Sequence, residues 1–148
     1  MRKFLVLLVG LMVLLSTEVT AGDFKEIPLP GNIQISAAPD GLPADEAVFL
    51  GAWEGKWDRL PVVVIITRIT TGGKVSGYYG WGKGRSFEAG SDKITGKIGL
   101  GKRDNKVLRF KYLSAKISFR VPKNGIGLKG KYKIDGRTTE GEFAKTDL

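Results

Sequence analysis

Residues 115–134 read AKISFRVPKNGIGLKGKYKI, and this stretch decides the fold class. In its first half Ile117 and Phe119 alternate with polar side chains, and its second half repeats the alternation with lysines. Apolar residues at every second position are typical of a β-strand with one buried face. The Asn124-Gly125 dipeptide between the halves accepts the positive φ of a tight turn. The stretch therefore predicts two antiparallel strands joined by a hairpin.

The same pattern continues through most of the chain. From Leu50 onward, short alternating runs are separated by Gly, Asn and Asp, and no long helical period intervenes. Eight short strands joined by tight turns predict an all-β, antiparallel up-and-down barrel, because closing such a meander removes its exposed edges. An open sandwich is the alternative. The eight expected strands cover residues 51–58, 61–70, 74–82, 91–100, 105–112, 115–122, 126–134 and 137–145.

The first 21 residues predict a signal peptide. Arg2 and Lys3 precede an apolar run at 4–15, and the segment closes with small residues, the last of them Ala21. The apolar run is shorter than the roughly 20 residues that span a bilayer, so no transmembrane segment is expected after cleavage. We expect cleavage after Ala21 and a periplasmic or secreted protein, with an uncleaved anchor as the alternative.

Charge and proline content divide the rest of the chain. Residues 22–43 are rich in Pro, Gly and Ala, which predicts a flexible leader, and 44–148 form the barrel domain with a short helical turn at its start. Residues 22–55 carry one basic and six acidic side chains, a net charge of −5, whereas 56–148 carry 21 basic and eight acidic ones, a net charge of +13. The run at 62–66 is apolar on both faces, so its outer side needs cover from the leader, the helical turn or a partner.

The composition excludes several kinds of chemistry. The chain has 24 Lys and Arg against 15 Asp and Glu, a formal net charge of +9, and neither histidine nor cysteine. Cysteine nucleophiles, Ser-His-Asp triads, histidine metal sites and disulfides are therefore ruled out, and we expect no cofactor or metal. A glycan-directed hydrolase would depend on carboxylates such as Glu54, Glu88 and Asp92, or on a Ser86–Lys83 pair. No motif surrounds them, which favours a non-catalytic protein.

Residues 49–57 read FLGAWEGKW. The Gly51-Ala52-Trp53 segment resembles the Gly-x-Trp opening of lipocalin-type barrels, and the whole run resembles a group of small exported bacterial proteins with a Phe-x-Gly-x-Trp-x-Gly-x-Trp opening. The lipocalin resemblance implies structural roles for Gly51 and Trp53, with Trp53 plugging the closed end of the barrel. Arg137 is then the candidate for the arginine of the last lipocalin strand, and the lipocalin disulfide is missing. Avidin-like barrels also begin with Gly-x-Trp, but their biotin-contacting pattern is not evident.

An aromatic set is predicted by strand parity to point largely into the barrel. Aromatic side chains at a barrel mouth would suit a small apolar or saccharide ligand. The structural alternative is that they fill the core, since an eight-stranded barrel has little spare volume. The set consists of Trp57, Tyr79, Trp81, Phe110, Phe119 and Tyr132.

A basic set is predicted on the outer face of three consecutive strands. Seven cations without an interleaved acid would attract a polyanion such as lipopolysaccharide, an anionic glycan of the cell envelope or membrane headgroups. A solvated face that discourages edge pairing is the alternative. Nucleic acid is disfavoured, because the aromatic residues alternate to the opposite face and form no stacking platform. The seven cations are Arg109, Lys111, Lys116, Arg120, Lys129, Lys131 and Lys133.

Overall fold

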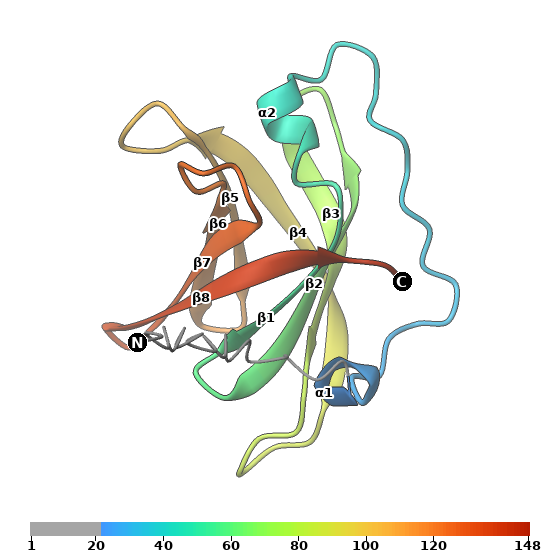
Figure 1. Ribbon diagram of the computed structural model, residues 1–148, viewed down its shortest axis with the longest axis vertical. Coiled ribbons are helices and arrows are strands. Elements are labelled where there is room, and N and C mark those ends of the chain that lie inside the picture. The colour runs from blue at the N-terminus through green and yellow to red at the C-terminus, as the bar shows by residue number, and fades with distance from the viewer. Residues whose placement is uncertain (1–21) are drawn as a thin grey trace, which may run out of the picture.

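The computed structural model describes residues 22–148, so the predicted signal peptide at 1–21 lies outside the described residues. The described chain forms one closed barrel of eight antiparallel strands in sequential order, as Figure 1 shows, which confirms the predicted fold class. No helix in the described part of the chain is long and apolar enough to cross a membrane.

Each strand pairs with its neighbours in the chain, and β1 also pairs with β8, which closes the barrel. The β1–β2, β5–β6 and β7–β8 connections are tight turns in which Asp58, Leu113 and Asp135 adopt positive φ. The strands are β1 Gly51–Trp57, β2 Leu60–Ile69, β3 Lys74–Trp81, β4 Gly90–Leu100, β5 Lys106–Tyr112, β6 Ala115–Arg120, β7 Leu128–Ile134 and β8 Arg137–Thr146.

The interior holds the apolar member of each alternating pair. Trp53 lies opposite Val64, which lies opposite Tyr79, and all three side chains are buried. The alternation in the expected strand at 126–134 also predicts that Ile126 faces the interior. That prediction was wrong, because Ile126 is 76% exposed. The alternation fails at Gly127, whose φ of +68° turns the backbone before β7 begins.

The N-terminal leader covers the outer side of β2. After α1 (Gly22–Lys25) the chain runs along the outside of the barrel to α2 (Ala44–Ala47), as Figure 1 shows. The leader residues Phe24 and Ile27 form a second buried apolar cluster with the outward-facing Val63 and Ile65 of β2. Farther along, the Ser36 amide donates a 2.8 Å hydrogen bond to the Thr67 carbonyl. The sequence left the leader, the helical turn or a partner as the possible cover for the run at 62–66. In the structure it is the leader that packs against this run.

One end of the barrel is closed by α2 and the residues that follow it. Trp53 donates its indole N–H to the Phe49 carbonyl at 3.0 Å, and the Lys145 ammonium lies 5.2 Å from the centroid of the Trp53 ring. Lys145 also donates to the Leu50 carbonyl at 3.1 Å. Arg137, the candidate for the arginine of the last lipocalin strand, pairs with Ile134 at the opposite end of β8 and therefore does not lie beside Trp53.

An ion pair fastens α2 to the barrel. The Lys106 ammonium at the start of β5 lies 2.8 Å from Oε1 of Glu46, which is a buried residue. Hydrogen bonding to Glu46 raises the pKa of Lys106 above its ordinary value of 10.5. Both charges are thus compensated at a site where a lone carboxylate would be costly.

Candidate functional site at the barrel mouth

The end of the barrel away from α2, called the mouth here, is ringed by aromatic side chains. The odd-numbered strands all run toward this end, because strand direction alternates around an antiparallel barrel. As a result β1 ends on Trp57, β3 on Trp81 and β5 on Tyr112, all on inward-facing positions, and Tyr132 lies near the end of β7. Trp57 is buried, whereas the other three are partly exposed.

These rings contact one another across the mouth. The Trp81 and Tyr112 ring centroids are 5.2 Å apart, and Tyr79 lies 5.1 Å from Tyr112. On the other side Trp57 and Tyr132 are 5.8 Å apart. Separations of this size are those of favourable aromatic pairs. The rings therefore form one packed layer whose upper members reach solvent.

Hydrogen bonds orient the polar atoms of this layer. The Trp57 indole N–H donates to the Tyr79 hydroxyl at 2.9 Å, and the Tyr112 hydroxyl donates to Oδ2 of Asp92 at 2.7 Å. The Trp81 indole N–H donates to the Glu88 carbonyl at 3.0 Å, which ties its ring to the β3–β4 loop. Asp92 pairs with Tyr79 in the ladder and therefore takes an inward-facing position, although its side chain remains exposed.

The two tyrosines resist ionisation for the same reason. Desolvation by burial raises the pKa of Tyr79, despite the opposing hydrogen bond from Trp57. Burial, followed by the hydrogen bond to the Asp92 carboxylate, raises the pKa of Tyr112 to about 12. Both hydroxyls are therefore protonated at neutral pH, and each can donate a hydrogen bond.

Below the mouth the barrel is filled by its own side chains. Phe110 contacts Phe119 at 6.1 Å between centroids, and Phe119 contacts Phe143 at 4.9 Å, with all three buried. A Cβ added at Gly130 would lie 2.6 Å from the Trp57 ring, and one added at Gly55 would lie 2.6 Å from Phe143. The strand glycines do create room, and the aromatic rings occupy it.

The six predicted aromatic residues are thus brought together but divide by depth. Trp57, Tyr79, Phe110 and Phe119 are buried, which leaves Trp81 and Tyr132 at the surface of the layer. The sequence pattern assigns Asp92 only to a possible catalytic role, and the predicted ligand set lacks Tyr112 and Phe143. Alternation along each strand could have identified both aromatic residues. Tyr112 is two residues from the inward-facing Phe110 on β5, and Phe143 is two residues from the inward-facing Gly141 on β8.

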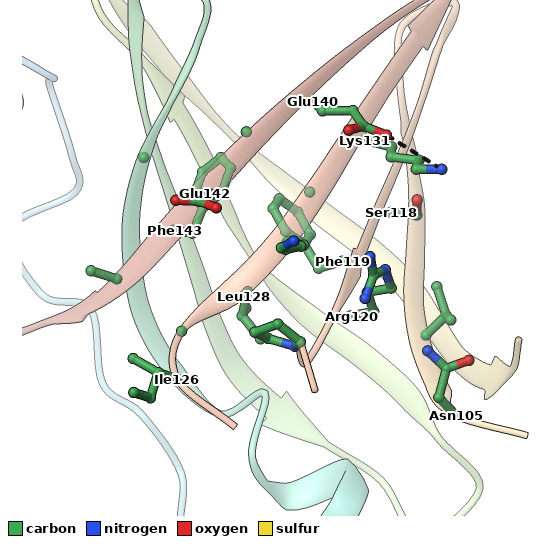
Figure 2. Close-up of a pocket in the computed structure, with 18 of the residues that line it drawn as sticks. Asn105, Ser118, Phe119, Arg120, Ile126, Leu128, Lys131, Glu140, Glu142 and Phe143 are labelled. Carbon is green, nitrogen blue, oxygen red and sulfur yellow. Dashed lines mark ion pairs between the residues drawn. The ribbon is translucent and has the colours of Figure 1, made fainter. Parts of the chain in front are cut away.

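The seven predicted cations share one outer face, because β5, β6 and β7 are neighbours in the sheet. Figure 2 shows an open depression over this face and β8, with Ser118, Arg120 and Lys131 at its sides. Glu140 and Glu142 of β8 border it, and Glu140 lies 3.5 Å from the Lys131 ammonium. The face therefore has an acidic edge on β8.

The carboxylates considered for catalysis are separated. Glu54 pairs with Val63 and Ala144 and lies on the outer parity of β1, whereas Asp92 faces the mouth. Glu88 is exposed on the β3–β4 loop and forms a 3.6 Å ion pair with Lys83. Across residues 22–148 no group of three or more acidic residues could hold a metal ion.

No protein-family model matches the chain, and comparisons with curated proteins and with solved structures found no match.

Proposed function

We propose that this protein is an exported, non-catalytic binding protein that takes a saccharide at the mouth of its barrel. The observation that carries the proposal is the pairing of partly exposed aromatic rings, Trp81, Tyr112 and Tyr132, with the exposed carboxylate of Asp92. Sugar rings present apolar C–H faces and polar hydroxyl edges, so an aromatic platform beside a hydrogen-bond acceptor fits both parts of such a ligand. Export is supported by the signal-peptide pattern in residues 1–21.

The filled interior supports a saccharide over an apolar ligand. A fatty acid or other long apolar molecule needs a cavity that removes its chain from water. Below the mouth, the rings of Trp57, Phe119 and Phe143 lie within 6.0 Å of one another, between centroids, and take up this space. A ligand that stacks on the rim requires no such cavity.

The test is a titration with panels of neutral oligosaccharides and fatty acids, in which binding is measured by intrinsic tryptophan fluorescence and by calorimetry. We expect saturable binding of at least one oligosaccharide and none of the fatty acids. Trp81→Ala should weaken saccharide binding about tenfold or more, as loss of a central aromatic contact does in other interfaces. Saturable binding of fatty acids alone would overturn the proposal.

Conservative variants separate binding from folding. Tyr112→Phe and Asp92→Asn keep the size of each side chain and should each weaken saccharide binding several-fold. Tyr78→Phe is the matched control, because Tyr78 faces the leader on the outer side of β3 and is remote from the mouth cluster. Equal affinity in all three variants would contradict a site at the mouth.

A further inference from the structure

The basic surface is larger than the three strands that suggested it. The β3–β4 and β4–β5 ladders place Lys74 opposite Lys97, and Lys97 opposite Arg109. Lys93 occupies the same outer parity on β4, opposite Tyr78. Three exposed lysines thus extend the face across β4 to β3. The surface, called the basic belt here, comprises Lys74, Lys93, Lys97, Arg109, Lys111, Lys116, Arg120, Lys129, Lys131 and Lys133.

No acid interrupts the outer face of the belt. The five strands β3 to β7 contain a single acidic residue, Asp92, which occupies an inward-facing position and accepts a hydrogen bond from Tyr112. The nearest acids in the ladder are Glu140 and Glu142 on β8. A single-signed surface of this extent concentrates positive potential and attracts polyanions.

The cations also lie in rows across the strands, and the repulsion within each row lowers the stability of the folded protein. Lys111 lies opposite Lys116, which lies opposite Lys133, and a second row sets Arg120 opposite Lys129. Like charges directly opposite in a sheet are destabilising. A solvated face could alternate both signs, as β7 and β8 do with Lys131 and Glu140. The cations within each row repel one another unless an anion lies over them.

The geometry points to a linear anionic polysaccharide as the ligand: we propose that the basic belt binds such a polymer through its repeated carboxylate or sulfate groups. Along β7 the cations recur about every 6.7 Å, and cations paired across neighbouring strands lie about 4.8 Å apart, so the anionic groups of an extended chain can meet neighbouring cations. The belt is separate from the aromatic site at the mouth, since the two lie on opposite faces of the sheet.

The surroundings favour a polysaccharide over a bilayer or a nucleic acid. Peripheral membrane surfaces combine cations with apolar side chains that insert between lipids. Among the described residues, the large exposed hydrophobics lie in loops, in turns or at strand ends, and none of them occupies an outward-facing position on β3 to β7. Apart from Tyr78, which packs beneath the leader, the aromatic rings of these strands face inward, which leaves no stacking platform for bases.

The experiment measures binding of heparin, polygalacturonate and neutral dextran by calorimetry between about 50 and 200 mM NaCl. We expect both anionic polymers to bind with affinity that falls steeply with salt, and dextran not to bind. The triple variant K111Q/K116Q/K133Q should bind about tenfold or more weakly at low salt. The matched control R59Q/R68Q/R85Q removes the same charge outside the belt and should stay within about twofold of the parent.

A variant that loses negative charge is tested as well, because tighter binding cannot be explained by a defect in folding. E140Q/E142Q removes the acidic edge and should bind heparin more tightly, whereas E26Q/D40N makes the same charge change in the leader and should not. Unchanged binding by K111Q/K116Q/K133Q, or an equal loss in R59Q/R68Q/R85Q, overturns the proposal. So does tighter binding to phosphatidylglycerol vesicles or single-stranded DNA than to either anionic polysaccharide.

Discussion

At the scale of single residues, strand glycines decide how the core packs. Gly130 lies under two rings, and a Cβ there would lie 2.6 Å from Trp57 and 2.7 Å from Phe119. We expect Gly130→Ala to lower the free energy of unfolding by about 1–3 kcal/mol, because overpacking forces rings off their preferred positions. Gly99→Ala is the control, since its Cβ would meet only Arg109 at 3.7 Å, an ordinary contact. Urea unfolding measures both, and equal stability would contradict the crowded interior.

The ion pair between Glu46 and Lys106 makes the stability of the protein fall as the pH becomes strongly alkaline. Because hydrogen bonding raises the pKa of Lys106 in the folded protein above 10.5, its stabilising effect is complete below that value. The effect is lost as pH rises through the folded pKa. Thermal unfolding from pH 8 to 12 should therefore show a steeper loss of stability in the parent than in Glu46→Gln/Lys106→Met. Parallel curves would show that the pair contributes nothing.

At the scale of elements, the leader is part of the folded structure. Ile27 is 5% exposed against β2, whereas Ile35 on the same leader is 41% exposed. Ile27→Ala should cost about 2–4 kcal/mol of stability, because it uncovers the outer side of Val63 and Ile65. Ile35→Ala removes the same atoms from a solvated position and should cost less than about 1 kcal/mol. Chemical denaturation gives both values, and a similar cost for the two would contradict a packed leader.

Repulsion within the basic belt predicts that two Lys→Gln substitutions change the stability of the protein in different directions. Lys116 lies between Lys111 and Lys133, so Lys116→Gln should stabilise the protein by about 0.2–1 kcal/mol at low salt. Lys131 lies between Ser118 and Glu140, so Lys131→Gln removes an attraction and should leave stability unchanged or lower. The difference should shrink in high salt, since exposed charges are screened. Melting temperatures in low and high salt test this, and destabilisation by Lys116→Gln would contradict it.

At the scale of the whole molecule, closure depends on the last strand. β8 pairs with both β7 and β1, so removing residues 137–148 would leave two edges open. We expect the shortened protein to aggregate, because unpaired strand edges pair with other chains. Removal of residues 147–148, which follow β8, is the control and should leave the protein monomeric. Light scattering distinguishes the two, and a monomeric protein without β8 would contradict the dependence on closure.

Periodicity was enough to predict the barrel, because period-two alternation and turn residues are local signals. It failed where a single glycine changes the parity, as Gly127 does before β7. The aromatic site was predicted in part: parity is enough to place Tyr112 inside, whereas its hydrogen bond to Asp92 follows only once neighbouring strands are in register. Local pattern carries no register, so Lys97 could not be placed beside Arg109. Arg137 is the only arginine of the last strand, which made it the candidate implied by the lipocalin resemblance, whereas the cation beside Trp53 in the structure is Lys145.

The pairing of β1 with β8 also bears on the order in which the molecule assembles. Gly55 meets Phe143, so the first strand cannot complete its hydrogen bonds until almost the whole chain is available. Contacts between such distant segments slow folding, because a long loop must close before they form. The sheet can therefore grow from its hairpins early, whereas the barrel forms only in a late step. A chain with this topology therefore remains an open sheet until its C-terminal strand pairs with β1.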